Sequence, residues 1–155
     1  MGAMTGGSSR ASRLGGYVLP GGPTDIRTVV AQAQAVEAAG LGAVYLGERY
    51  ATKDLPSIAG ALSQVTSTVR LIGAVTHIGT RHPMVLASMG QTLQALSGDR
   101  FVLGFGRGSA GRWGSYGITP PTAAALADTA DILRRLWAGE RVAYDGPAGA
   151  FPDLK

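Results

Sequence analysis

The sequence contains no cysteine, and this absence excludes disulfide bridges and thiolate metal sites. Histidine is almost as scarce, because His77 and His82 are the only two in the chain. No Asp, Glu or Cys close to them in sequence supplies a third ligand, so we expect no metal centre.

Long apolar runs are missing as well, since no stretch approaches the ~18 residues that a membrane-spanning helix needs. The first sixteen residues are small and polar and lack the apolar core of a signal peptide. We therefore expect a cytoplasmic protein without a membrane partner. Residues 1–15 are expected to be disordered or vector-derived, and residues 16–155 to form the folded domain.

Charged residues make up only 15% of the chain, and alanine and 24 glycines take their place. The net charge of +4 is of the sign that nucleic-acid-binding proteins carry. The arginines, however, are scattered from Arg10 to Arg141 and form no basic stripe. Small anionic ligands fit this charge at least as well, so we expect a small-molecule substrate and no nucleic-acid partner.

Four apolar segments, each followed by an amphipathic pattern, predict four strand–helix units. The expected strands span residues 16–20, 43–46, 69–78 and 101–105. The expected helices begin at Thr24, Asp54, Pro83 and Thr122, and three of them end at Gly40, Gly98 and Gly139. The tail over residues 141–155 is rich in turn residues and is expected to hold no further strand.

Strands that are apolar on both faces and alternate with helices indicate a parallel sheet of the α/β class. A doubly wound open sheet and a barrel both satisfy this pattern. In either architecture ligands bind at the carboxyl ends of the strands. The rule predicts that functional residues lie in four loops: 20–22, 47–53, 77–82 and 104–113.

Three of these loops carry candidate site residues. Glu48 is a candidate proton carrier and Arg49 a candidate clamp for an anion, although the same pair is also typical of a surface ion pair. His77 stands at a strand end and is a candidate for catalysis or cofactor contact, or else a structural histidine. His82, directly before Pro83, is expected to cap the helix that follows.

The fourth strand runs into a glycine-rich loop over residues 104–109 (GFGRGS). Its glycines allow backbone N–H groups to approach a ligand, and Arg107 is suited to pairing with a phosphate. The spacing matches neither the dinucleotide-binding fingerprint nor a Walker loop.

Three sequence blocks occur in the order found in the luciferase-like monooxygenase superfamily, and the chain resembles its branch that uses the 5-deazaflavin coenzyme F420. They are AVYLGERYATKDLP, VRLIGAVTHIGTRHPMVLASMGQTLQALSGDRF and LGFGRG. The RHP helix start and the LSGDRF helix exit are the most characteristic parts. With the flanking segments, the resemblance covers nearly all of residues 16–155.

The resemblance implies a (β/α)8 TIM barrel, of which this chain holds the first four βα units. Such a half-barrel has parallel strands with outer helices, and a whole barrel needs ~250 residues. Four strands cannot close, so the chain is expected to be truncated and to leave a sheet edge and a core face exposed. The implied partners are a second copy of the chain, as a homo-oligomer, or a complementing second half-barrel.

In this superfamily the cofactor ring lies over the end of the third strand, often against a bulge with a non-proline cis peptide. The matching residues are Gly73, Ala74 and Val75, with Thr76 and His77 beside the ring. A further set is implied around the cofactor phosphate: Gly106, Arg107 and Gly108.

The loop after the second strand often carries the acid or histidine close to the hydride-bearing carbon, and here Glu48 and Arg49 stand there. F420-dependent dehydrogenases of the family often have Asp-His at this place, so the chain departs from that pattern. Arg49 and Tyr50 are the matching candidates for substrate binding, and Glu48 and His77 for catalysis.

The resemblance therefore implies an oxidoreductase that transfers a hydride between F420 and an organic substrate, incomplete in this chain alone. Two alternatives remain open: an FMN-dependent monooxygenase of the same superfamily, and a non-catalytic half-barrel that serves in binding or assembly.

Overall fold

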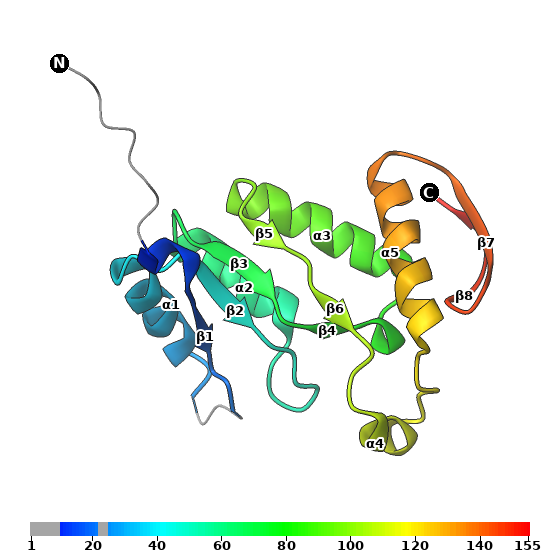
Figure 1. The fold of residues 1–155 in the computed structure, drawn as a ribbon, viewed down its shortest axis with the longest axis horizontal. Helices are drawn as coiled ribbons and strands as arrows, with labels where there is room; N and C mark the ends of the chain where they lie inside the picture. The colour runs from blue at the N-terminus through cyan, green and yellow to red at the C-terminus, as the bar shows by residue number, and fades with distance from the viewer. Residues whose placement is uncertain (1–9, 22–24) are drawn as a thin grey trace.

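The computed structural model describes residues 10–21 and 25–155, and its course is shown in Figure 1. Its α-helices are α1 (Thr28–Ala38), α2 (Leu55–Val65), α3 (Pro83–Ser97), α4 (Ala110–Trp113) and α5 (Ala123–Trp137). Short 3-10 helices are η1 (Arg10–Arg13), η2 (Ile78–Thr80) and η3 (Gly114–Tyr116). The strands are β1 (Gly15–Val18), β2 (Ala43–Leu46), β3 (Arg70–Gly73), β4 (Thr76–His77), β5 (Phe101–Val102), β6 (Phe105–Gly106), β7 (Val142–Gly146) and β8 (Gly149–Leu154).

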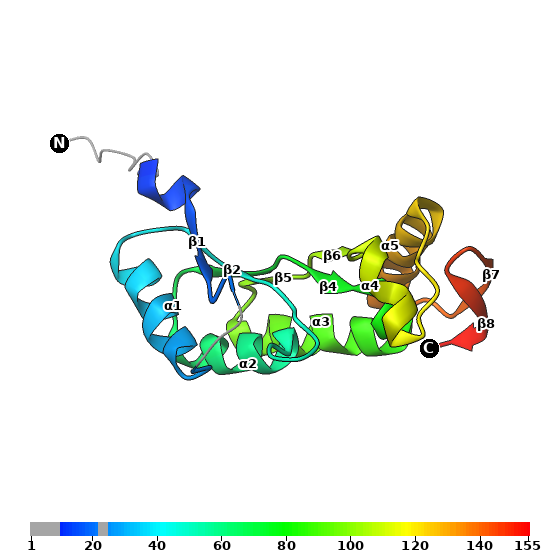
Figure 2. The ribbon, with the colours of Figure 1, turned by 90° about the horizontal axis from the view of Figure 1, so that it is seen from below.

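A four-stranded parallel sheet in the order β1-β2-β3-β5 forms the centre of the fold. Helices α1, α2 and α3 lie along one face of it (Figure 2). The main apolar core fills this layer, where the buried strand residues Val44, Leu71 and Phe101 meet helix residues such as Leu62 and Leu86. The α/β class and the parallel sheet predicted from the sequence are confirmed.

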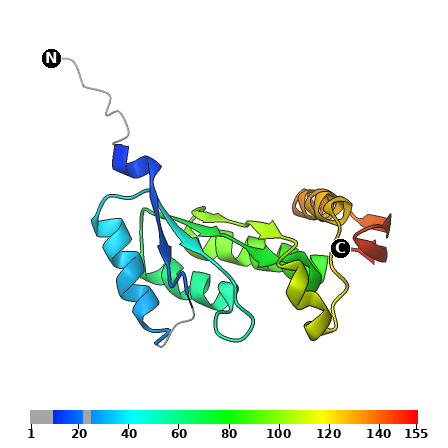
Figure 3. The ribbon, with the colours of Figure 1, turned by 60° about the horizontal axis from the view of Figure 1, so that its bottom comes forward.

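The opposite face of the sheet carries no helix from the described part of the chain (Figure 3). Strand register places Tyr17, Tyr45, Ile72 and Val102 in one row across this face. Tyr17 and Val102, at the two ends of the row, are 44% and 42% exposed. The uncovered face is therefore apolar and continuous across all four strands.

The starts of three helices agree with the capping residues predicted from the sequence. Asp54 accepts a hydrogen bond from the Ser57 N–H at 3.1 Å, and Thr122 accepts one from the Ala125 N–H at 3.0 Å. His82 Nδ1 accepts from the Met84 N–H at 3.2 Å, as expected of a capping histidine. These side chains satisfy donors that have no partner within the helix.

The first helix begins later than predicted, because α1 starts at Thr28. Asp25 precedes the helix and accepts a hydrogen bond from the Arg27 N–H at 2.9 Å in a separate turn. The predicted N-cap, Thr24, lies outside the described residues.

The third and fourth strands, expected to be continuous, are each interrupted. The break between β3 and β4 contains a cis peptide bond between Ala74 and Val75, at the position that the family resemblance predicts. Beyond the breaks, β4 and β6 pair with each other in parallel, so the third and fourth strand segments remain adjacent.

The prediction that the tail holds no further strand is wrong. Strands β7 and β8 form an antiparallel hairpin over residues 142–154, with the turn residues Pro147 and Ala148 between them. The turn residues of this segment do indicate a turn, but the strands on either side of it are stabilised by burial against α5, which the local pattern does not indicate. Val142 and Leu154 pack with Ile132 of α5 in a second, smaller core.

Two polar side chains hold the amino-terminal edge of the sheet, where the strands begin. Glu37 Oε1, from the end of α1, accepts from the N–H groups of residues 67–69 and from the Thr68 hydroxyl. Arg100, directly before β5, donates to Ser63 O, Val69 O and both oxygens of Thr66. Each side chain ties a helix to the start of a strand.

Candidate functional site

The break between β3 and β4 is a backbone bulge over residues 73–76, held by hydrogen bonds from three strands. The Ala74 N–H donates to Leu46 O at 2.6 Å, and the Thr76 N–H donates to Gly104 O at 3.0 Å. The Tyr17 hydroxyl donates to Ala74 O at 3.2 Å. The bulge is therefore fixed to its neighbours on both sides at the carboxyl edge of the sheet.

Gly104 allows this close approach of the fourth strand. A Cβ on Gly104 would lie 2.0 Å from Gly73 O, which no side chain permits. Because glycine has no side chain, the backbones of the two strands can lie this close together.

Below the bulge, Glu48 belongs to a closed network of hydrogen bonds. Its Oε1 lies 2.5 Å from Arg81 Nη2, and its Oε2 accepts from Arg81 Nη1 at 2.6 Å and from the Thr76 hydroxyl at 2.5 Å. Arg81 Nη2 also pairs with Asp54 at 3.0 Å. The Glu48 side chain is 2% exposed, and its ion pair is a buried one with Arg81 and not the surface pair with Arg49 that the sequence offered as an alternative.

This network links the second loop, the bulge and the start of α3. Burial alone would lower the pKa of Arg81, but the hydrogen bond and charge of Glu48 raise it. Both Glu48 oxygens are occupied by partners within the protein. The geometry therefore makes Glu48 a residue that positions Thr76 and the bulge, and its predicted role as a proton carrier stays a prediction.

His77 follows the bulge and has an unusual environment. Its Nδ1 is buried and has no hydrogen-bond partner in the described part of the chain. Burial lowers the pKa of His77, the charge of Arg81 acts in the same direction, and Glu48 opposes them. We assign the proton of the neutral ring to Nε2, because Nδ1 faces no acceptor that would hold it.

The His77 ring lines a cavity of about 440 Å³ together with two loops, residues 49–52 and 108–116. The ring centroid of Tyr50 lies 5.2 Å from that of His77, and Trp113 packs edge to face against His77 with 5.6 Å between the ring centroids. Tyr116 packs against Tyr50 at 5.4 Å. A histidine with a free donor thus lies among aromatic rings at the carboxyl edge of the sheet.

Gly108 is required for this packing. It has a φ of +76°, and a Cβ there would lie 2.2 Å from the Trp113 ring and 3.0 Å from His77 Nδ1. The absence of a side chain at Gly108 therefore allows Trp113 and His77 to pack against each other and against this backbone.

The loop over residues 49–53 is closed on itself and anchored. The Arg49 N–H donates to Lys53 O at 2.9 Å, and the Lys53 N–H donates to Arg49 O at 2.7 Å. Lys53 is 3% exposed, and its Nζ donates to Leu19 O at the end of β1. Burial, with the charge of Arg49, lowers the pKa of Lys53.

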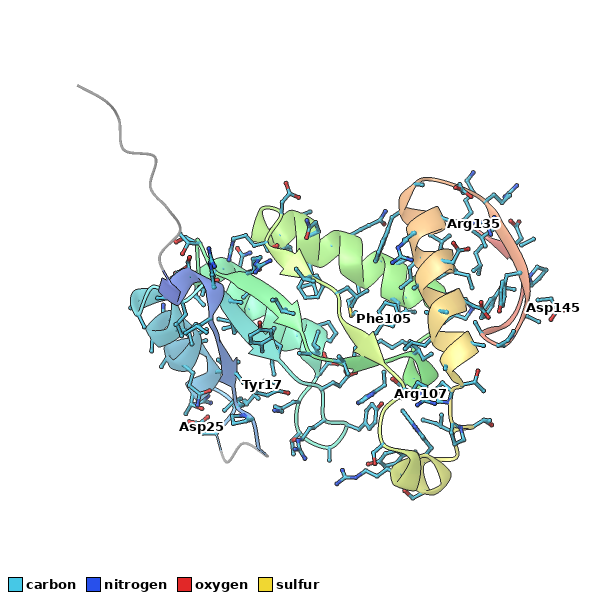
Figure 4. The ribbon with its side chains drawn as sticks, in the orientation of Figure 1. Tyr17, Asp25, Phe105, Arg107, Arg135 and Asp145 are labelled. Atoms are coloured by element: carbon cyan, nitrogen blue, oxygen red, sulfur yellow. The ribbon has the colours of Figure 1, made fainter. Side chains whose placement is uncertain are left out.

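The structure brings most of the predicted site residues to one edge. Arg49, Tyr50, His77 and Gly108 line the cavity, and Gly106 pairs with His77 across β4 and β6. Arg107 stays apart: it is exposed on the loop after β6 (Figure 4) and does not line the cavity.

Sequence reasoning missed four residues of the site: Arg81, Arg112, Trp113 and Tyr116. Arg81 was present in the RHP motif, but nothing local showed that it pairs with an acid 33 positions away. The other three belong to α4 and η3, which the sequence pattern did not predict.

Among the described residues, no group of three or more His, Asp or Glu side chains is arranged to hold a metal ion. Within the same residues, none of the helices has the length and apolar character that crossing a membrane requires.

Known proteins with similar folds share this arrangement of strands and helices. The structure of a coenzyme F420-dependent tetrahydromethanopterin reductase from Methanopyrus kandleri superposes with a TM-score of 0.77 at 22% identity, covering 93% of this chain and 46% of that protein. An FMN complex of a type II Baeyer–Villiger monooxygenase, the oxygenating constituent of 3,6-diketocamphane monooxygenase from Pseudomonas putida, gives 0.76 at 17% identity, covering 94% and 44%.

Sequence similarity reaches the same group of proteins. A 5,10-methylenetetrahydromethanopterin reductase from Methanolobus tindarius is 28% identical over 137 residues, which are 86% of this chain and 41% of the reductase. The chain thus spans about two fifths of the length of this relative. The sequence profile of the luciferase-like monooxygenases matches residues 4–153, and the chain belongs to that family.

Proposed function

We propose that this chain forms the cofactor-ring side of an F420-dependent oxidoreductase that transfers a hydride to or from an organic substrate. In this proposal the parallel sheet is the first four βα units of a (β/α)8 barrel. The observation that carries it is the bulge over residues 73–76, which lies between the uncovered sheet face and His77. The similarity to two reductases of the tetrahydromethanopterin type, one named as F420-dependent, supports the choice of cofactor.

The residues present suit a flat aromatic cofactor. The row of Tyr17, Tyr45, Ile72 and Val102 offers an apolar surface across the sheet, next to the Ala74–Val75 peptide. Gly73, Ala74, Val75 and Thr76 would hold the ring through their backbone. When bound, F420 would supply or accept a hydride, and the protein would orient the reacting groups.

His77 is the residue best placed to act on the substrate. Its neutral ring would donate a hydrogen bond from Nε2 to a substrate oxygen, and would so polarise that oxygen and stabilise the negative charge that develops there during hydride transfer. Arg49 and Tyr50 would bind the substrate. Arg107, with the backbone of Gly106 and Gly108, would pair with an anionic group of the cofactor.

Two specific observations favour other functions. The similarity to an FMN-bound monooxygenase supports flavin chemistry on the same fold. The exposed apolar row supports a non-catalytic half-barrel whose sheet face is covered by a second copy or by a complementing chain.

Titration of the purified chain with F420 and with FMN, followed by cofactor fluorescence, tests the proposal. We expect saturable binding of F420, weaker binding of FMN, and about a tenfold loss of F420 affinity in Arg107→Ala. Arg134→Ala, which removes an exposed arginine on α5, is the matched control and should leave affinity unchanged. Tighter binding of FMN favours the monooxygenase, and no binding of either cofactor up to about 1 mM, or ~4 kcal/mol, favours the non-catalytic half-barrel.

A further inference from the structure

The cavity beside His77 presents aromatic rings to solvent. Tyr50 and Tyr116 are 41% and 44% exposed, although each packs against the other. Trp113, by contrast, is only 2% exposed, and its ring centroid lies 6.1 Å from that of Tyr50. Exposed rings on a buried aromatic support form a surface on which a further planar ring stacks.

The same cavity is positively charged. Arg49 and Arg112 line it, and neither side chain forms a hydrogen bond or an ion pair with any other described residue. None of the residues that line it is an Asp or Glu. Glu48 directly precedes Arg49 in the sequence, but both of its carboxylate oxygens are hydrogen-bonded to Arg81 and Thr76. An anion entering the cavity therefore meets two free guanidinium groups and no carboxylate.

We propose that this cavity is a substrate subsite for aromatic carboxylates, with the ring on Tyr50 and Tyr116 and the carboxylate on Arg112. The fork of a guanidinium matches the two oxygens of a carboxylate, and Arg49 adds a second positive charge. An oxygen substituent on the ring then faces the Nε2–H of His77. A cavity of about 440 Å³ holds a substituted single ring with room for a side chain.

The reaction assigned to this subsite rests on the proposed function, whereas the binding of an aromatic carboxylate there does not. It names the substrate class of the oxidoreductase: an aromatic acid with a carbonyl or hydroxyl group beside His77. The role is separate from that of Arg107, which is assigned to the cofactor and lies outside the cavity.

Benzoate is the probe for the subsite, with benzyl alcohol as the neutral ring and acetate as the anion without a ring. The chain has two tryptophans, so ¹⁵N-labelled protein gives two indole N–H signals, which Trp137→Phe assigns. We expect benzoate to shift the Trp113 signal saturably and to leave the Trp137 signal in place. Both benzyl alcohol and acetate should bind at least tenfold more weakly.

Arg112→Ala should weaken benzoate binding about tenfold, and the exposed Arg134→Ala should leave it unchanged. Because Arg112 is exposed on α4, its removal is not expected to unfold the chain, and circular dichroism checks this. Equal binding of benzoate and benzyl alcohol, equal binding of acetate, or an unchanged affinity in Arg112→Ala would overturn the proposal.

The F420 titration separates this inference from the proposed function. We expect Arg112→Ala to lower benzoate affinity with unchanged F420 affinity, and Arg107→Ala to do the reverse. Benzoate binding without F420 binding would retain the subsite and reject the cofactor. F420 binding without benzoate binding would reject the subsite alone.

Discussion

The two edges of the central sheet differ in how far their polar side chains are hydrogen-bonded within the protein. At the amino-terminal edge, Glu37 and Arg100 each make four hydrogen bonds that tie helices to strand starts. At the carboxyl edge, His77 Nδ1 has no partner within the described residues, and the side chains of Arg49 and Arg112 are unpaired there. The polar side chains at the amino-terminal edge stabilise the fold, whereas the guanidinium groups of Arg49 and Arg112 at the carboxyl edge remain available to a ligand.

This difference indicates where the chain tolerates a cost to its free energy of folding. A buried nitrogen without a partner costs about 1–3 kcal/mol, and cations gathered without acids repel one another. Natural sequences accept such costs mainly at functional sites. Within the carboxyl edge the Glu48–Arg81 network and the contact of Lys53 with Leu19 O are exceptions, because they hold the bulge and the loop over residues 49–53 in place.

The largest expected effect concerns this network. Glu48→Gln leaves Arg81 largely buried without its main counter-charge, and we expect a loss of about 3 kcal/mol in the free energy of unfolding. Glu140→Gln, which breaks the exposed Arg135–Glu140 pair, is the control and should cost less than about 0.5 kcal/mol. Urea denaturation measures both, and equal costs would show that Glu48 has no structural role at the bulge.

Gly108→Ala should have the next largest effect. The positive φ and the contact with Trp113 predict a loss of about 2 kcal/mol, together with a displaced Trp113 ring. Gly111→Ala is the matched control in the same segment, since its Cβ meets no atom within 4 Å. Denaturation and the Trp113 indole signal report the two effects, and a stable Gly108→Ala with an unmoved signal would contradict the packing described.

A smaller effect is expected at the amino-terminal edge. Burial alone would raise the pKa of Glu37, but the N–H groups of residues 67–69 and the Thr68 hydroxyl lower it from 4.5 to about 2. Since the folded-state pKa is depressed, the stabilisation is complete above about pH 4.5 and is lost as the pH falls towards 2. Solvent screening limits it to about 1 kcal/mol.

Glu37→Gln checks this. The variant should be about 1 kcal/mol less stable at pH 7. Its stability should also fall less than that of the wild type between pH 4.5 and 2. Parallel pH profiles of wild type and variant would show that Glu37 gains nothing from its partners.

The smallest effect is the titration of His77 itself. Burial lowers the pKa of His77, so NMR should show it titrating below the ordinary value of 6.5. The stability linked to its neutral form is present above pH 6.5 and is lost as the pH falls through the folded-state pKa. Nitrogen chemical shifts should also place the proton on Nε2, and a proton on Nδ1 would contradict the assignment.

Local sequence signals predicted the parts of the fold that depend on neighbouring residues. The bounds of β2 and the caps at Asp54, His82 and Thr122 all follow from patterns within a few positions. The position of the cis bulge followed from the family resemblance, since no local pattern marks it.

The missed features depend on residues that are distant in sequence. The β7–β8 hairpin is stabilised by burial against α5, and Glu48 meets Arg81 only through the fold. The cavity likewise forms because Gly108 turns α4 and Trp113 back onto His77. Predicting these contacts requires the arrangement of the strands, which periodicity does not give.

The closed loop over residues 49–53 has a consequence for the speed and cost of ligand capture. Two backbone hydrogen bonds and the contact of Lys53 with Leu19 fix this loop before any ligand arrives. The backbone of Arg49 and Tyr50 is therefore ordered in advance, and the entropy of ordering that backbone is lost at folding and not at binding. A ligand that enters the cavity meets a preformed wall, so its association rate should depend on diffusion and charge more than on loop closure.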